Sequence, residues 1–122
     1  MGSDILINRL TVAFGAGSDA AAVKNVTTRF FSGQVTGLIG ESGSGKSVLG
    51  MSILRLLPSS ARLSGAIEFD GENLLSFSAR EMQALRGSRI GLIPQSPGDS
   101  LDKVLRIRVQ LEEALLAHSG QG

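Results

Sequence analysis

The eight residues from Gly40 to Ser47, GESGSGKS, have the types and the spacing needed to bind a chain of phosphates. They fit the pattern G-x-x-x-x-G-K-S/T. Its glycines let the backbone curl, so that successive N–H groups point at phosphate oxygens. Lys46 can reach the β- and γ-phosphates, and the Ser47 hydroxyl can be a ligand of Mg²⁺. The pattern predicts a nucleoside triphosphate site made of Gly40, Glu41, Ser42, Gly43, Ser44, Gly45, Lys46, Ser47 and Val48.

The segments on either side of this loop have the patterns that such a site requires. Gln34 to Ile39 is apolar enough for a short buried strand, and Ser47 to Leu57 has helical spacing that Pro58 ends. Strand, glycine loop and helix in that order form a P-loop, with the positive end of the helix at the phosphate site. The rival dinucleotide pattern G-x-G-x-x-G fails, because Val48 stands in its last position.

Composition narrows the class of protein. The chain has 122 residues, 42% hydrophobic and 19% charged, which is typical of one globular domain. A net charge of +1 and an aromatic content of 4% argue against a nucleic-acid partner. The absence of cysteine excludes disulfides and is typical of cytoplasmic proteins. We expect neither a signal peptide nor a segment long and apolar enough to span a bilayer.

Further elements follow from alternation and turn residues. Leu10 to Phe14 and Val26 to Phe30 alternate, which predicts an antiparallel pair of strands. Residues 58–65 are expected to form a polar link. Residues 66–69 are expected to form a strand that ends in a hairpin turn at Asp70-Gly71.

The second half of the chain has one strong local signal and two weaker ones. Ser78-Ala79-Arg80-Glu81 is a capping box that predicts a short helix, which Gly87 ends. Ile90 to Ile93 is expected to be a buried strand, and residues 94–103 a loop. Leu105 to Leu116 is expected to be an amphipathic helix.

In this order, these parts resemble the ATPase subunit of ABC transporters. The loop GESGSGKS, residues 67–74 (IEFDGENL) and residues 86–95 (RGSRIGLIPQ) look like the oligopeptide, dipeptide and nickel importer ATPases. The resemblance extends from about Ile5 to Leu116. It implies an α/β fold of the P-loop NTPase class, ABC-ATPase type. The expected parts are an antiparallel β subdomain, the P-loop strand, loop and helix, and a strand leading to a glutamine loop.

The resemblance also assigns roles to single residues. Lys46 and Gln95 would be catalytic, with Gln95 contacting Mg²⁺ and the attacking water, so that Ser47 and Gln95 form the metal site. Phe14 would stack on the adenine of ATP, although it could equally pack inside the sheet. The family usually has an aromatic or Met before this glutamine and an acid after it, whereas this chain has Pro94 and Ser96.

The family's helical subdomain, LSGGQ signature, Walker B strand and switch histidine all follow the glutamine loop. We therefore expect residues 1–122 to be a partial nucleotide-binding domain, the N-terminal half of a longer ATPase, with an incomplete core. Leu63-Ser64-Gly65 is interpreted as a linker, and His118 as a solvated residue. In the family the Walker B strand lies between the P-loop strand and the Gln95 strand. Residues 35–39 and 90–93 should therefore lose their strand partners or re-pair.

The function implied is an ATP-binding subunit that energises uptake of peptides or nickel-type solutes and that, as this chain alone, binds Mg·ATP with little hydrolysis. Implied partners are transmembrane permease subunits, a second ABC ATPase subunit and, indirectly, a periplasmic or extracellular solute-binding protein. The implied location is cytoplasmic, on the inner face of the membrane. Two alternatives remain: a non-catalytic nucleotide-binding regulator, and a small P-loop kinase or GTPase. Against the latter, the chain has no N-K-x-D motif and its arginines are scattered at Arg86, Arg89, Arg106 and Arg108.

Overall fold

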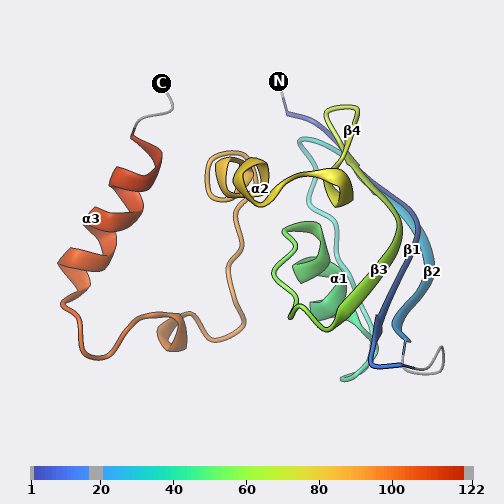
Figure 1. Cartoon of the computed structure of the whole chain (residues 1–122), viewed down its shortest axis with the longest axis horizontal. Coiled ribbons are helices and arrows are strands. Elements are labelled where there is room, and N and C mark those ends of the chain that lie inside the picture. Colours follow the sequence, from blue (N-terminus) through green and yellow to red (C-terminus); the bar gives the residue numbers. More distant parts are fainter. Residues whose placement is uncertain (1, 17–20, 120–122) are drawn as a thin grey trace. The chain divides into compact units, whose positions relative to one another are not determined.

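The computed structural model describes residues 2–16 and 21–119. The chain divides into two compact units, Met1–Met82 and Gln83–Gly122, and each is described by itself. The first unit contains a sheet of order β2-β1-β3-β4 in which all the paired strands are antiparallel. Its strands are β1 (Ile5–Phe14), β2 (Ala21–Phe30), β3 (Ala61–Phe69) and β4 (Glu72–Asn73). The predicted β1–β2 pair is confirmed, with both strands longer than expected (Figure 1).

Irregularities in β1 and β2 keep the apolar side chains on the inner face of the sheet. Arg9 and Asn25 adopt positive φ angles of 49° and 47°. Their backbone N–H groups donate to threonine hydroxyls, Arg9 to Thr27 Oγ1 and Asn25 to Thr11 Oγ1, each at 3.0 Å. An extra residue in a strand shifts which face the following side chains occupy. The largest fully buried side chains are Ile7, Leu10, Val12, Ser52, Ile67, Leu74 and Met82.

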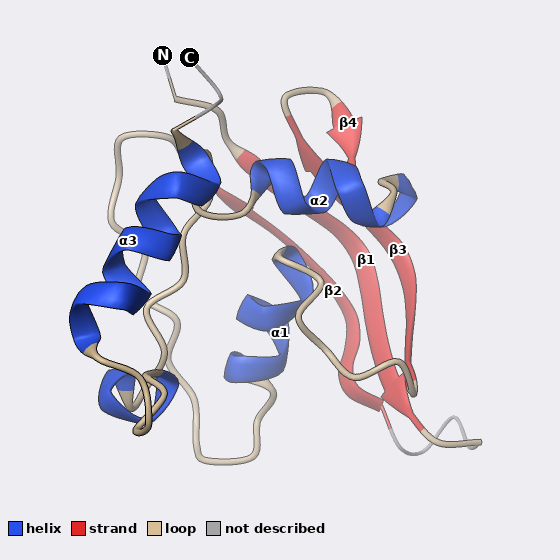
Figure 2. Cartoon of the chain, turned by 60° about the vertical axis from the view of Figure 1, so that its left-hand side comes forward, coloured by secondary structure: helices blue, strands red, loops and turns tan. Residues whose placement is uncertain are grey.

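Helix α1 (Lys46–Ile53) lies on one face of this sheet in both views (Figures 1 and 2). The predicted helix is confirmed in type, but it begins one residue earlier than predicted, at Lys46, and ends at Ile53 rather than at Leu57. Arg55 adopts a positive φ of 52°, which breaks the helical backbone before Pro58 is reached. Leu49 and Leu54 are buried, so the helix contributes directly to the core.

Strand β3 is the first correction to the sequence prediction. It begins at Ala61, so residues 58–65 are not merely a polar link, and Leu63-Ser64-Gly65 is strand rather than linker. The reason is pairing with β1, which places Leu63 opposite Val12. The hairpin at Asp70-Gly71 is confirmed, with φ angles of 54° and 78° typical of a two-residue type I′ turn.

The second correction concerns the two strands expected beside the phosphate site. Residues 34–40 form no strand, and residues 90–93 contribute only an isolated bridge between Ile90 and Arg86. Val35, Ile39 and Ile93 are 103%, 96% and 87% exposed. Parallel strands are stable when they are paired and covered. Among the residues that the structure describes, residues 34–40 have no strand partner and residues 90–93 keep only this bridge, as their expected loss of partners implies.

The capping box at Ser78 is confirmed. Ser78 N–H donates to Glu81 Oε2 at 2.6 Å, and Glu81 N–H donates to Ser78 Oγ at 3.2 Å. These bonds begin α2 (Ala79–Leu85), which follows a short 3-10 turn, η2 (Leu74–Ser76). The Ser78 backbone N–H, followed by its hydroxyl, lowers the pKa of Glu81 by favouring the carboxylate. Helix α2 ends at Leu85, and Gly87, which was predicted to end it, follows with a φ of 78°.

The second unit contains a 3-10 helix, η3 (Pro97–Ser100), and helix α3 (Ile107–His118). The predicted helix is confirmed, with its start and its end two residues later than expected, and it has no buried residue. Gln110 holds the preceding loop, because its Oε1 accepts from Asp102 N–H at 2.8 Å and its Nε2 donates to Asp102 O at 2.9 Å. His118 is exposed, as expected for a solvated residue. Its ring also lies against Gly87, where a Cβ would come within 2.6 Å of Nε2.

Candidate phosphate-binding site

The backbone of the predicted phosphate loop is shaped by two glycines with left-handed conformations. Gly43 has a φ of 83°, and Gly45, the N-cap of α1, has a φ of 93°. Ser44 N–H donates to Glu41 O at 3.1 Å, which closes a turn inside the loop. A side chain at either glycine would strain this backbone, because L-residues rarely adopt such φ values. The loop therefore has glycine at both of these left-handed positions, where glycine is favoured.

The loop rests on strand β2 through Gly45. A Cβ built on Gly45 would lie 2.4 Å from the Ala22 carbonyl oxygen and 3.5 Å from Val23 Cγ2. Only a glycine allows the backbone to approach that closely. Gly45 O also accepts the first helical bond of α1, from Leu49 N–H at 2.9 Å. The sheet thus fixes where the helix begins and where its N-terminal N–H groups lie.

These N–H groups are suited to an anion. The first N–H groups of a helix have no acceptor within the helix, and here they belong to Lys46, Ser47 and Val48. No acidic residue occupies the first turn of α1 to compete for them. The helix dipole adds positive potential at the same end. The arrangement can hold the oxygens of a phosphate chain.

Lys46 lies half-buried within the loop. Its Nζ donates to the carbonyl oxygens of Gly40 and of Glu41, the latter at 2.7 Å. A third bond goes to Ser44 Oγ at 3.1 Å. The ammonium is therefore held at the centre of the loop, where the sequence pattern requires a cation for the phosphates.

A cavity of about 410 Å³ adjoins the loop. Its walls come from β2, from residues 38–40 and from loop residues 44–46, with Leu49 of α1. Two lysines line it, Lys24 of β2 and Lys46 of the loop. The participation of β2 in this wall was not predicted from the sequence. The pair of small residues Ala21 and Ala22 is the only sequence signal that could have indicated it.

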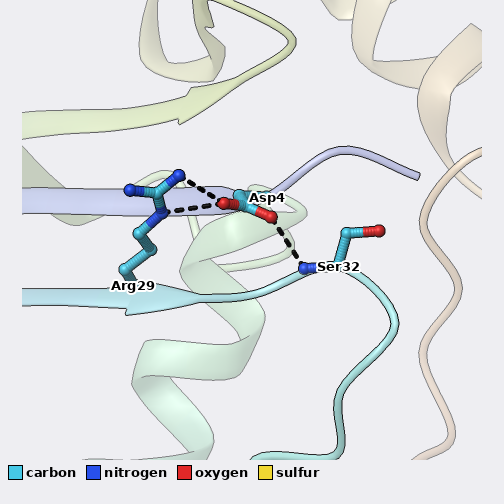
Figure 3. A network of polar contacts seen from close by, with 3 residues as sticks. All are labelled: Asp4, Arg29 and Ser32. Atoms are coloured by element: carbon cyan, nitrogen blue, oxygen red, sulfur yellow. Dashed lines mark hydrogen bonds and ion pairs between the residues drawn. The ribbon is translucent and has the colours of Figure 1, made fainter. Parts of the chain in front are cut away.

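The chain enters the loop from an anchored turn at the end of β2. Asp4 contacts both Arg29 of β2 and Ser32 of the chain that follows β2 (Figure 3). Its Oδ1 accepts from Ser32 N–H at 2.7 Å, and its Oδ2 accepts from Arg29 Nε at 2.8 Å. The Ser32 N–H first, and then Arg29, lower the pKa of Asp4. The guanidinium of Arg29 also lies 4.9 Å from the centroid of the Phe31 ring.

A magnesium ion would have Ser47 as its ligand from the loop. Ser47 is exposed at the start of α1, and within residues 2–16 and 21–119 no group of three or more His, Cys, Asp or Glu side chains could hold a metal. In general Mg²⁺ keeps several waters and takes few protein ligands beside phosphate oxygens.

The remaining predicted site residues lie apart from the loop in sequence. Phe14 is the last residue of β1, half-buried and opposite Ala61, and it does not line the cavity. Gln95 is exposed at a bend just before η3, in the second unit. The adenine-stacking role of Phe14 and the metal-contacting role of Gln95 stay predictions.

No helix in the described part of the chain has the length and hydropathy of a membrane span.

Comparison with known proteins gives a consistent result. The ABC transporter family matches residues 23–119. The oligopeptide transport ATP-binding protein OppD of Salmonella typhimurium is 36% identical over 115 residues, which are 93% of this chain and 34% of that protein. The probable peptide ABC transporter ATP-binding protein y4tR of Sinorhizobium fredii is 42% identical over 86% of this chain and 32% of its own length.

A third relative, the dipeptide transport ATP-binding protein DppD of Lactococcus lactis, is 40% identical over 83% of this chain and 29% of its own length. The chain spans about a third of the length of these relatives. The family match covers most of the chain and includes the whole phosphate loop and α1. This chain therefore belongs to the ABC transporter family, among relatives named as ATP-binding proteins of peptide transport.

Proposed function

We propose that this chain binds Mg·ATP through Gly40–Ser47 as part of the ATP-binding subunit of an ABC transporter. The observation that carries the proposal is the loop itself. Gly45 seats it against Ala22 of β2, and Lys46 occupies its centre at the start of α1. This geometry is what a polyphosphate site requires, and the family match supports ATP as its ligand.

Each part of the loop has a distinct task in this proposal. The N–H groups of the loop and of the first turn of α1 would donate to phosphate oxygens, and the Lys46 ammonium would offset their negative charge. The Ser47 hydroxyl would be one ligand of Mg²⁺, which screens charge between neighbouring phosphates when it is bound. Phe14 would stack on the base, and Gln95 would face the metal and the attacking water.

The substrate and partners are proposed from the relatives. Their names mention oligopeptides, peptides and dipeptides, which favours peptides over nickel-type solutes as the transported class. An ATP-binding subunit acts on transmembrane permease subunits, so this protein would dock at the inner face of the membrane. We also propose pairing with a second ATPase subunit and indirect action with an external solute-binding protein.

Calorimetric titration of Mg·ATP into the 122-residue chain tests the proposal. Lys46→Ala should weaken binding by about tenfold to a hundredfold, because a charge-assisted bond contributes roughly 1.5–3 kcal/mol. Lys24→Ala is the matched control. It removes the same charge from the wall of the same cavity but lies outside the loop, so its affinity should stay within about twofold of the wild type.

Two results would contradict the proposal. One is the absence of binding heat from a chain whose NMR spectrum shows a folded sheet. The other is an equal loss of affinity in Lys24→Ala and Lys46→Ala. Such a result would mean that the affinity depends on the net positive charge of the cavity and not on the position of Lys46 in the loop. Phosphate release measured on the same samples distinguishes a small P-loop enzyme, which would turn over substrate rapidly, from a binding subunit.

A further inference from the structure

The hydrogen bonds around Lys46 use every proton that its side chain offers. An ammonium group has three N–H donors and no acceptor. In the structure they go to Gly40 O, Glu41 O and Ser44 Oγ. A phosphate oxygen that bonds to this ammonium must therefore displace one of three existing acceptors.

The three acceptors are not equivalent. The two carbonyl oxygens belong to the loop backbone, and the bond to Glu41 O is 2.7 Å long. The bond to the Ser44 hydroxyl is longer, at 3.1 Å, and it is the only one made by a side chain, which can rotate away. Ser44 is thus the acceptor that yields most easily.

Gly40 makes room for this hydroxyl. A Cβ on Gly40 would come within 2.7 Å of Ser44 Oγ, so a larger residue there would push the hydroxyl off its position. Ser42 and Ser47, the two other serines of the loop, have no bond to Lys46 in the described structure. The contact is therefore specific to Ser44 rather than general to the loop.

We propose that Ser44 is a positioning residue. Its hydroxyl accepts a hydrogen bond from the third N–H of Lys46, and a phosphate oxygen replaces it as the acceptor when phosphate binds. This inference rests on the proposed function of the loop. The exchange is favourable, because an anionic phosphate oxygen attracts the ammonium by charge, whereas the neutral hydroxyl oxygen of Ser44 carries no net charge. It also sets the affinity, because binding must first break the bond between Lys46 and Ser44.

Ser44→Ala tests the proposal, and Ser60→Ala is the control, because Ser60 is an exposed serine in a turn outside the phosphate loop. The probes are Mg·ATP and sodium tripolyphosphate, titrated calorimetrically into the whole chain. Ser44→Ala should bind tripolyphosphate about threefold more tightly, since one competing hydrogen bond has gone. Ser60→Ala should stay near the wild-type value. Unchanged binding by Ser44→Ala would overturn the proposal. Weaker binding would also overturn it, because it would show that the Ser44 hydroxyl itself binds phosphate.

A second readout separates this proposal from the proposed function. NMR relaxation of the Lys46 side chain without any phosphate should show greater mobility in Ser44→Ala than in the wild type or Ser60→Ala. If the wild type binds neither probe, the proposed function fails, and greater mobility of Lys46 in Ser44→Ala would then support only the part of the proposal in which Ser44 holds Lys46 in place. Unchanged Lys46 relaxation in Ser44→Ala would overturn the positioning role, whatever the titrations give.

Discussion

Gly43→Ala and Gly45→Ala form a pair of substitutions that isolates the contact between the phosphate loop and the sheet. Both glycines belong to the same loop and both have left-handed φ angles, 83° and 93°. A Cβ on Gly43 would meet nothing within 4 Å, whereas one on Gly45 would lie 2.4 Å from Ala22 O. The two variants therefore share the backbone strain and differ in the collision with β2.

The size of the difference follows from this geometry. A left-handed conformation costs an L-residue roughly 1–2 kcal/mol, so both variants should lose about that much. In Gly45→Ala, the Ala22 oxygen must also retreat by roughly 0.6 Å to reach even a tight separation of 3.0 Å. Backbone shifts of this kind cost about 1–3 kcal/mol. We expect Gly45→Ala to melt about 10 °C below Gly43→Ala, and to bind Mg·ATP at least about tenfold more weakly than it.

The assay is a thermal melt followed by circular dichroism, together with calorimetric titration of Mg·ATP. The melt does not depend on the ligand, so it tests the seating of the loop even if nucleotide binding fails. Equal melting temperatures and equal affinities for the two variants would refute the reasoning. They would show that the close approach of Gly45 to Ala22 contributes nothing to the position of the loop.

Two further predictions concern other parts of the first unit. Because its pKa is lowered from 4.5, Glu81 stabilises α2 fully above about pH 4.5, and this contribution is lost as the pH falls through the folded-state pKa. In Glu81→Gln, amide exchange in α2 should lose that acid-dependent step; an unchanged pH profile would contradict the capping role. Ile39→Ser should change the free energy of unfolding by less than about 0.5 kcal/mol, since Ile39 is 96% exposed, whereas Ile67→Ser, at a fully buried position, should cost about 3 kcal/mol or more in denaturant titrations. Similar costs for the two isoleucines would show that residues 34–40 are packed.

Several features were predictable from sequence because a few adjacent residues decide them. The capping box of Ser78 and Glu81 needs only four residues, and the hairpin at Asp70-Gly71 needs only a turn that tolerates positive φ. The glycine positions of the phosphate loop are of the same kind. Each follows from local backbone geometry, which the residue types specify directly.

Features that depend on a distant partner were missed or shifted. Residues 34–39 have the composition of a buried strand, yet they remain exposed because strand formation requires a neighbouring strand. Residues 61–65 have no strong strand pattern, yet they form β3 because β1 offers a partner. The composition of a segment indicates whether it could form a strand. Whether it does so depends on a partner strand elsewhere in the folded unit.

The amino-acid sequence alone determined the kind of ligand, because glycine, lysine and serine at these intervals are suited to bind phosphate. Only the tertiary structure decided where the loop sits and what holds it. The approach of Gly45 to Ala22 joins residues that are far apart along the chain. The three bonds of Lys46 depend on how the loop curls, since they need atoms to meet at hydrogen-bonding distance. Distances of that kind follow from packing, and no pattern of residue types specifies them.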